Sequence, residues 1–387
     1  MAQGVWDPEF AEVASTLDAT VAARGEGGAS VCVYHRGRPV VDVWTGERDA
    51  GVAWTADTLV MAFSTTKGVT STLLHQCVDR GLLDYDDRVA EHWPEFAVNG
   101  KDAITVRQVL CHRAGLYDLT GVASTALDLL DWDRMVDGVA SMTPALEPGS
   151  ASAYHAVTFG WLVGGLIERV TGTSFRDVLS SQLVEPLGLD GCYIGAPADQ
   201  LGRVASLMRG GLADEMAADP GELVEVARQL GFTVHPDLIA AALPAWVGDL
   251  PIEESLEIPI PAANGCFTAR SLVRIYAALA AGGELDGVRI LGSETLRRAT
   301  EVQNETEPDL VLALPMSWRL GYHGVITTAG VHPQAFGHQG LGGSGAFADP
   351  ERDLAVAYLP NALGSMLAGD LRLLEIGGAA VRAADAV

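Results

Sequence analysis

Leu59-Val60-Met61-Ala62-Phe63-Ser64-Thr65-Thr66-Lys67 joins an apolar run to a segment with helical periodicity, Gly68 to Arg80. Residues three apart on a helix lie on one face, so we expect Lys67 to bring its amine back to the Ser64 hydroxyl. The helix N-terminus adds unpaired, partly positive N–H groups beside that hydroxyl. Serine becomes nucleophilic when a base takes its proton, and an amine with a lowered pKa can do so. Ser64 and Lys67 are therefore a candidate nucleophile and base.

This four-residue pattern is weak evidence when it stands alone. Serine and lysine are common residues, and Thr65 and Thr66 could simply cap a helix. The rest of the chain must supply the context.

Composition limits the class of protein. The chain has 387 residues, of which 48% are hydrophobic and 19% charged, enough for one large domain or two closely joined ones. Lys and Arg number 25 against 50 Asp and Glu, so the net charge is −25. Such a charge repels phosphate backbones and anionic lipid surfaces, which disfavours nucleic acid and membranes as partners.

The cysteines indicate the compartment. They are odd in number, scattered, and set among apolar neighbours: Cys32, Cys77, Cys111, Cys192 and Cys266. This pattern is typical of reduced core residues of an intracellular protein. The first residues lack the pattern of a signal peptide, and each apolar run ends before the roughly 18 residues of a membrane span. We expect a cytoplasmic protein.

Strand signals lie near both ends of the chain, and helical signals lie between them. β-Branched and apolar alternation predicts strands over residues 30–35, 39–45, 318–322, 345–348 and 354–359. Residues 68–187 are mostly helical in pattern. We therefore predict an α+β fold of the multi-domain type, with an antiparallel sheet from both termini flanked by helices and a mostly helical lobe.

The expected domain boundaries follow from this pattern. An α/β domain comprises residues 1–66 and 262–387, and a helical domain comprises residues 67–261. Pro-, Gly- and Asp-rich breaks near 196–260 indicate an insertion that either walls a pocket or is a surface excursion without a role in binding. A cleft between the two lobes is where we expect the site.

Two further motifs follow Ser64 in a recognisable order: Tyr154-His155-Ala156, and then Gly337-His338-Gln339-Gly340 just before a strand. With these three motifs the chain resembles the serine β-lactamase and penicillin-binding-protein superfamily. More specifically, it resembles the family VIII carboxylesterases, which are similar to class C β-lactamases. The resemblance covers nearly the whole chain, including residues 112–116 and 340–361.

The resemblance implies a role for each motif. Ser64 would be acylated, while Lys67 and Tyr154 would share the work of general base and acid. His338, Gln339 and Gly340 would line the edge strand facing the serine and bind substrate. The free pKa of tyrosine is about 10, so Tyr154 suits this place if Lys67 favours its phenolate or if it relays a proton. The alternative for Tyr154 is a buried ring with a satisfied hydroxyl.

The resemblance also implies an oxyanion hole, made by the backbone N–H groups of Ser64 and Leu341. Such a donor typically stabilises the transition state by about 3 kcal/mol. Gly340 would let the strand approach the acyl group closely, because glycine has no Cβ.

The sequence departs from the β-lactamase pattern at two positions. Ala156 stands where those enzymes have an asparagine that holds the β-lactam side chain. His338 stands where they have a lysine, so a titratable imidazole replaces a fixed positive charge. Both changes disfavour β-lactams and favour neutral esters. The alternative for His338 is a strand residue that only forms hydrogen bonds.

Other short motifs do not indicate a functional site in this chain. Residues 340–345 match G-x-G-x-x-G but precede a strand and an acidic turn, whereas a dinucleotide site needs a following helix. The sequence contains no G-x-S-x-G, which excludes the α/β-hydrolase nucleophile elbow. It contains no H-E-x-x-H, and we expect neither metal nor cofactor. His112 is expected to support the site through hydrogen bonds rather than to catalyse.

These observations predict a serine hydrolase, specifically a carboxylesterase that cleaves small or short-chain esters through an acyl-Ser64 intermediate. Alternatives in the same superfamily are a D-aminopeptidase or amidase, a weak β-lactamase, and an acyltransferase. A different class, a non-catalytic binding or scaffold relative, would not need Ser64, Lys67 and Tyr154 together. The sequence leaves open whether the protein forms a homo-oligomer.

Overall fold

The main sheet is built from both ends of the chain. The computed structural model describes residues 1–208, 225, 229, 231–304, 307–364 and 370–387. Its long sheet has the order β1-β3-β2-β13-β12-β11-β10, with β4 (Val52–Ala53) paired to β3. The other strands are β1 (Gln3–Trp6), β2 (Gly28–His35), β3 (Arg38–Asp49), β10 (His323–Thr327), β11 (Gly330–Gln339), β12 (Gly345–Asp349) and β13 (Leu354–Pro360).

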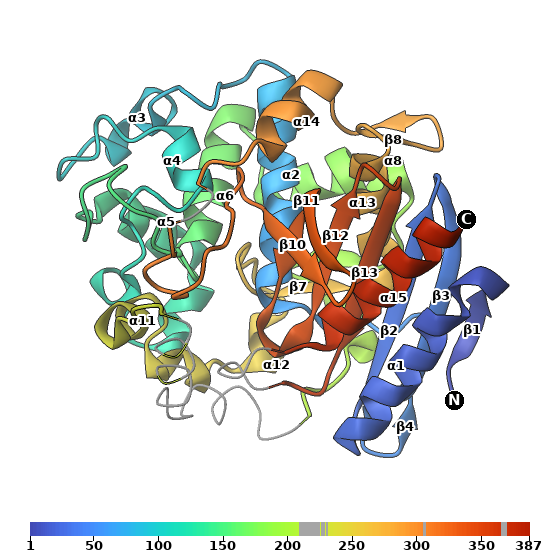
Figure 1. Cartoon of the computed structure of the whole chain (residues 1–387). Coiled ribbons are helices and arrows are strands. Elements are labelled where there is room, and N and C mark those ends of the chain that lie inside the picture. The colour runs from blue at the N-terminus through green and yellow to red at the C-terminus, as the bar shows by residue number, and fades with distance from the viewer. Residues whose placement is uncertain (209–224, 226–228, 230, 305–306, 365–369) are drawn as a thin grey trace.

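The two ends of the chain meet where β2 pairs with β13. This pairing is antiparallel, like the others in the sheet, and it places Val33 opposite Val356. Figure 1 shows the blue N-terminal and red C-terminal segments side by side in this sheet. The predicted α+β fold, with an antiparallel sheet from both termini and a helical lobe, is confirmed.

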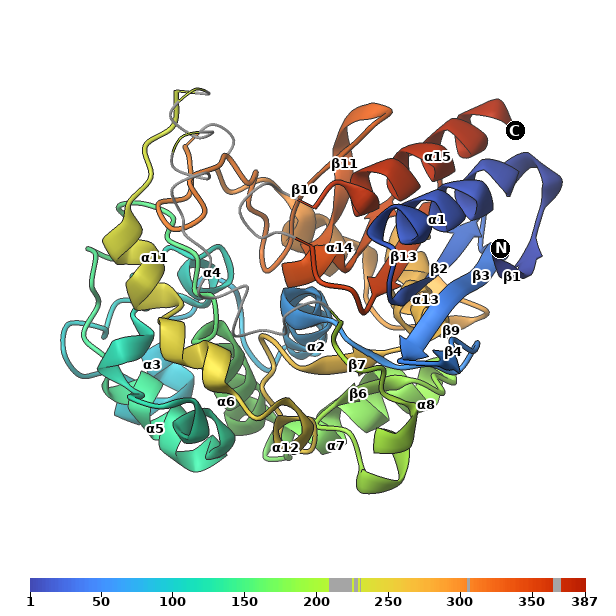
Figure 2. The ribbon, with the colours of Figure 1, turned by 90° about the horizontal axis from the view of Figure 1, so that it is seen from below.

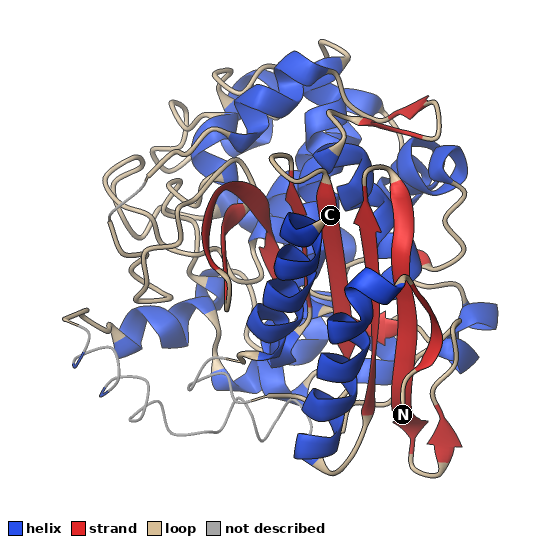
Figure 3. Ribbon diagram, turned by 45° about the vertical axis from the view of Figure 1, so that its right-hand side comes forward, coloured by secondary structure: helices blue, strands red, loops and turns tan. Residues whose placement is uncertain are grey.

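Helices cover both faces of the sheet (Figure 3). α1 (Ala11–Arg24) and α15 (Arg372–Ala386) pack together on one face (Figure 2), and α13 (Ala269–Ala280) packs against β2, β12 and β13 on the other. Successive side chains of a strand point to opposite faces. Accordingly Val31 and Val33 join the apolar cluster beneath α1 and α15, whereas Cys32 and Tyr34 join the larger cluster on the opposite side.

α2 (Thr66–Asp79) lies between the helical lobe and the sheet (Figure 1). Every α2 residue from Thr66 to Val78 is buried, and α2 packs against α6. The other helices of this part are α3 (Val89–His92), α4 (Val106–Leu110), α5 (Trp132–Ser141), α6 (Phe159–Thr171), α7 (Phe175–Leu179) and α8 (Glu185–Leu187). Within the described residues, no helix has the length and apolar character needed to cross a bilayer.

Shorter elements complete the described chain. They are the strands β5 (Val60–Met61), β6 (Cys192–Ile194), β7 (Gly265–Phe267), β8 (Glu284–Leu285) and β9 (Val288–Arg289), and the helices α11 (Pro236–Ala242), α12 (Ile252–Ser255) and α14 (Ser293–Thr300). Strands β5, β7 and β6 form a separate small sheet. Part of the predicted insertion near 196–260, namely 209–224, 226–228 and 230, lies outside the described residues.

The strand predicted over 318–322 is wrong. These residues alternate in hydropathy, but their backbone N–H groups bond outside the sheet: Leu320 to the Ala299 carbonyl and Gly321 to the Leu110 carbonyl. Trp318 donates its N–H to the Asn304 side chain. The segment therefore ties the helical lobe to the rest of the molecule, and the edge strand β10 begins only at His323.

Candidate active site

Ser64 stands at the point where β5 turns into α2. β5 pairs with β7, and the Ala62 N–H donates to the Gly265 carbonyl over 2.8 Å. Phe63 then has a φ of 46°, a left-handed conformation that bulky residues rarely adopt. This turn leads into a short 3-10 segment, Phe63–Thr65, which continues directly into α2. Ser64 thereby lies at the N-terminal end of a helix whose position is fixed by burial.

Lys67 lies within hydrogen-bond distance of Ser64, as the helix spacing predicted. Its side chain is 0% exposed. Its Nζ lies 3.0 Å from Ser64 Oγ, 2.7 Å from the Ala156 carbonyl oxygen and 3.0 Å from the Ala262 carbonyl oxygen. Burial lowers the pKa of Lys67 well below the usual value of a lysine. Burial therefore favours the neutral amine, which is the form that can accept a proton.

The three contacts of Lys67 suit a proton acceptor. A neutral amine has two N–H bonds and one lone pair. When its two N–H bonds point to the carbonyls of Ala156 and Ala262, its lone pair faces the Ser64 hydroxyl. After it takes a proton, the third N–H donates back to Ser64 Oγ, so all three donors of the ammonium are satisfied. Both protonation states fit the same geometry.

Tyr154 reaches the same hydroxyl from the loop before α6. Lys67 Nζ lies 4.8 Å from the centroid of the Tyr154 ring. Burial raises the pKa of Tyr154, and a hydrogen bond with the Ser64 side chain opposes part of this rise. The expectation that Lys67 would favour a phenolate is therefore wrong, because desolvation outweighs the favourable interactions. Tyr154 presents a neutral hydroxyl, which leaves proton relay as its role in the prediction.

The Tyr154 ring is enclosed by aromatic side chains. Trp318 is stacked on it, with 5.6 Å between ring centroids and 10° between planes, and His112 lies 4.8 Å away. His112 is buried, and its Nδ1 accepts the backbone N–H of His155 over 3.2 Å. Burial lowers the pKa of His112 well below the usual value, so its ring is neutral. As predicted, His112 forms hydrogen bonds beside the site.

The third motif ends β11, which pairs with both β10 and β12, so the expectation that it lies on the edge strand is wrong. Gly340 nevertheless brings this motif against the Ser64 segment. A Cβ at Gly340 would lie 2.3 Å from the Ala62 carbonyl oxygen and 2.8 Å from Thr65 Oγ1, so only glycine fits this close approach. Ser344 joins the same two residues, because its Oγ donates to the Ala62 carbonyl over 2.8 Å and lies 3.1 Å from Thr65 Oγ1. The 3-10 turn Leu341–Gly343, which carries the predicted oxyanion donor, starts directly after Gly340.

His338 differs from the titratable group that the sequence suggested. Its side chain is 3% exposed, and its Nδ1 donates to the Gln339 carbonyl over 2.7 Å. Burial lowers the pKa of His338 well below the usual value, so the ring is neutral at physiological pH. His323 likewise has a pKa of about 4, and its Nε2 accepts the Gln339 N–H over 2.9 Å. Gln339 itself has an exposed side chain.

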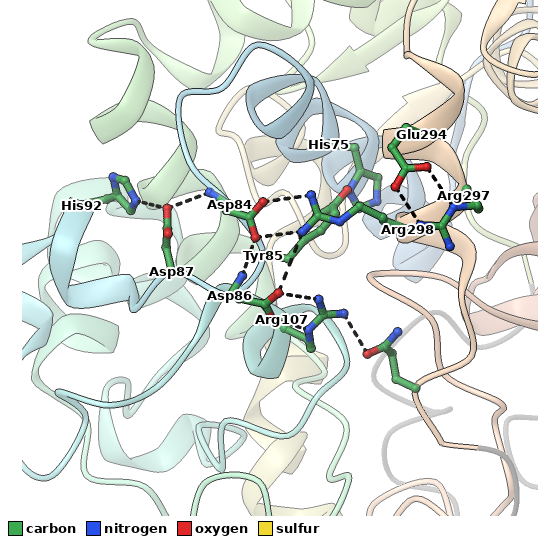
Figure 4. A network of polar contacts seen from close by, with 11 residues as sticks. His75, Asp84, Tyr85, Asp86, Asp87, His92, Arg107, Glu294, Arg297 and Arg298 are labelled. Atoms are coloured by element: carbon green, nitrogen blue, oxygen red, sulfur yellow. Dashed lines mark hydrogen bonds and ion pairs between the residues drawn. The ribbon is translucent and has the colours of Figure 1, made fainter.

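A polar network holds the far end of α2 (Figure 4). His75 has a pKa of about 3 and is neutral, so its Nε2 donates to the Leu320 carbonyl and its Nδ1 accepts the Tyr85 hydroxyl over 2.9 Å. Arg298 from α14 lies over the Tyr85 ring and pairs with both carboxylate oxygens of Asp84. The helix that carries Lys67 is thus fixed at both ends.

One cluster of metal-ligating groups occurs among the described residues: Asp87, Glu91 and His92. These side chains are half-buried or exposed, and His92 Nε2 lies 2.9 Å from Asp87 Oδ2 (Figure 4). The cluster shares no residue with the Ser64 site, whose own groups are a hydroxyl, an amine, a phenol and neutral imidazoles.

Comparison with known proteins gives concordant matches. Residues 13–379 match the model of the Beta-lactamase family. "Esterase/beta-lactamase LipL" of Mycobacterium tuberculosis is 42% identical over 370 residues, covering 94% of this chain and 84% of that protein. A penicillin-binding-protein homologue from Caulobacter crescentus has a TM-score of 0.88 and 38% identity, covering 99% of this chain and 100% of the other. A family VIII carboxylesterase structure has a TM-score of 0.86 and 34% identity, with the same coverage.

Proposed function

This chain belongs to the Beta-lactamase family and is a serine hydrolase of that fold, and from this we propose that it is a carboxylesterase cleaving small or short-chain esters through an acyl-Ser64 intermediate. The observation that carries the proposal is the environment of Lys67. A buried amine with a lowered pKa lies 3.0 Å from Ser64 Oγ, and its other two hydrogen bonds go to backbone carbonyls.

The proposed reaction has two halves. Ser64 Oγ bonds to the ester carbonyl carbon while its proton passes to Lys67. The carbon–oxygen bond to the alcohol then breaks, and Tyr154 gives its hydroxyl proton to the leaving oxygen and recovers a proton from Lys67. In the second half, water attacks the acyl-enzyme, its proton passes to the Lys67–Tyr154 pair, and Ser64 regains its hydroxyl as the acid leaves.

The N–H groups of Ser64 and Leu341 would hold the developing oxyanion. The close approach of Gly340 to Ala62 and Thr65 supports this, because it brings the turn starting at Leu341 against the Ser64 segment. Donors fixed by backbone geometry stabilise the transition state without reorganisation.

Two features support esters over β-lactams. Ala156 lacks a side-chain amide and uses its carbonyl to hold Lys67. His338 is neutral and buried, so it offers no positive charge to a substrate carboxylate. Weak β-lactamase activity is the second candidate, because the mycobacterial relative is named both an esterase and a β-lactamase. D-Aminopeptidase, amidase and acyltransferase activities would use the same acyl-enzyme intermediate, and we rank them after β-lactamase activity.

We keep two further predictions as part of the proposal. The first is an α/β domain of residues 1–66 and 262–387 beside a helical domain of residues 67–261. The second is that the insertion near 196–260 forms a wall of the pocket. The wall is supported by one apolar cluster, which gathers Leu256 and Ile252 of the insertion with Phe63, the neighbour of Ser64 in sequence, and with Leu341. We also infer a cytoplasmic location, which the five free, buried cysteines support.

A fluorophosphonate probe followed by intact-mass measurement tests the proposal. We expect one adduct on the wild type and none on Ser64→Ala. Equal labelling of Ser64→Ala, or no labelling of the wild type, would instead favour a non-catalytic binding or scaffold protein. Nitrophenyl esters, a chromogenic cephalosporin and a D-alanyl amide then rank the hydrolase candidates. Fast cephalosporin turnover without ester cleavage would place β-lactamase activity ahead of carboxylesterase activity.

A further inference from the structure

Asp309 is a buried carboxylate that binds the backbone of Tyr154. Its side chain is 0% exposed. Its Oδ1 accepts the N–H of Tyr154 over 3.1 Å, and also the N–H groups of Val311 and Leu312 over 2.9 and 3.0 Å. Its Oδ2 accepts the indole N–H of Trp318 over 3.0 Å. One carboxylate therefore links the Tyr154 backbone to Trp318.

Trp318 in turn holds the Tyr154 ring. The two rings are stacked with 10° between their planes. Trp318 is completely buried, and its own N–H is bound by Asn304 Oδ1 over 2.9 Å. His112 contacts both rings, with centroid distances of 4.3 Å to Trp318 and 4.8 Å to Tyr154. Asp309 thus constrains Tyr154 at the backbone and, through Trp318, at the ring.

The bonding pattern of Asp309 fits an ionised carboxylate. All four of its partners are donors, and a protonated carboxyl would have to place its own O–H against one of them. Burial raises the pKa of Asp309, and these hydrogen bonds oppose the rise. The negative charge of Asp309 also contributes to the raised pKa of Tyr154.

Burial is the main cause of the raised pKa of Tyr154, the hydrogen bond with Ser64 opposes it, and the charge of Asp309 adds to it. Lys67 faces the ring, and Ser64 forms a hydrogen bond with the hydroxyl. The rings of His112 and His338 are neutral through burial, so neither adds a charge. Asp309 is accordingly the anion that acts on this phenol.

We propose that Asp309 is a positioning residue for Tyr154, which fixes the phenol through the backbone and Trp318 so that its hydroxyl proton can pass to the leaving group. Neither Asp309 nor Trp318 belongs to the three motifs. The inference rests on the proposed function, because it requires Tyr154 to transfer a proton during ester cleavage.

Asp309→Asn tests the proposal in the full-length protein with p-nitrophenyl butyrate. An asparagine keeps one acceptor oxygen but turns an N–H₂ group toward the Trp318 N–H or the backbone donors. These contacts must therefore rearrange, and Tyr154 and Trp318 must move with them. We expect kcat to fall by about 10- to 100-fold, since small misplacements at a reacting centre cost this much, while KM changes little. A fall in kcat at unchanged KM is the expected sign of a misplaced proton donor, because substrate binding does not use the Tyr154 backbone contact.

Asp349→Asn is the matched control. Asp349 is also 0% exposed and accepts the Glu351 N–H and an Arg352 N–H, but it is the last residue of β12 and lies next to the turn that leads into β13. Its replacement should leave kcat and KM at their wild-type values. A loss of activity from general destabilisation would instead appear in both variants.

Trp318→Phe tests the same positioning role if Asp309→Asn does not fold. It keeps an aromatic ring but removes the indole N–H that binds Asp309, so kcat should fall while KM changes little. A folded Asp309→Asn with wild-type kcat, or a Trp318→Phe with wild-type kcat, would overturn the inference and leave the esterase proposal standing. Failure of the wild type to cleave any ester would instead overturn the esterase proposal.

Discussion

Lys67 Nζ lies 3.0 Å from Ser64 Oγ, one helical turn along the chain, and its remaining hydrogen bonds go to two backbone carbonyls. The same three positions serve the amine before and after it takes a proton. Proton transfer from Ser64 therefore requires no rearrangement of the groups around Lys67. Burial supplies the other requirement, because it lowers the pKa of the amine.

Replacing Lys67 with methionine should abolish most activity. Methionine has a similar length and tolerates burial, but it cannot accept the Ser64 proton. General-base catalysis contributes about 10²- to 10⁴-fold, so we expect kcat/KM for a nitrophenyl ester to fall by that factor. Circular dichroism would check that the fold is kept. A folded Lys67→Met variant with near wild-type turnover would remove Lys67 from the mechanism.

Tyr154→Phe separates the hydroxyl from the ring. The stacking on Trp318 and the backbone bond to Asp309 do not use the hydroxyl, so they should persist in the variant. We expect the free energy of unfolding to change by no more than about 1 kcal/mol, because only one hydrogen bond is lost. We expect kcat to fall by about 100-fold or more, because the proton donor is lost. Wild-type kcat in this variant would favour a purely structural Tyr154.

The sequence was sufficient for the parts of the site that depend on short-range geometry. Ser64 and Lys67 are three residues apart on one helix, and helix spacing alone predicts their contact. The pattern of strands and helices likewise gave the antiparallel sheet from both termini. Tyr154 and Gly340 required the resemblance to a family, because no local rule brings distant segments together.

Asp309 and Trp318 show where sequence analysis stops. Asp309 lies 155 residues from Tyr154, and no short motif surrounds it. Trp318 was assigned to a strand because its neighbours alternate in hydropathy, although its N–H groups bond to side chains. The protonation of His338 was also beyond reach, since it depends on how completely the folded chain excludes water from the ring.

Gly340→Ala tests the close approach of the third motif. The new Cβ would lie 2.3 Å from the Ala62 carbonyl oxygen, so the turn starting at Leu341 must move away from Ser64. We expect a loss of about 1–3 kcal/mol in the free energy of unfolding from overpacking, and a kcat loss of up to about 100-fold from the displaced oxyanion donor.

Gly121→Ala is the control for this substitution. Gly121 also lacks a positive φ, and a Cβ there would meet no atom within 4 Å. Urea unfolding and ester kinetics should show no appreciable change in this variant. Equal behaviour of the two alanine variants would mean that the Gly340 contact does not position the oxyanion donor.

Acid should unfold this protein through its buried neutral histidines. The pKa values of His75, His155 and His323 are about 3, 3 and 4, whereas unfolded histidine titrates near about 6.5. Between these values the unfolded chain binds more protons, so stability falls as pH decreases, by about 1.4 kcal/mol per pH unit for each histidine. Urea unfolding from pH 7 to pH 5 measures this slope. His75→Gln, which can keep one donor and one acceptor, should reduce the slope by one such increment, and an unchanged slope would show that His75 is not buried in its neutral form.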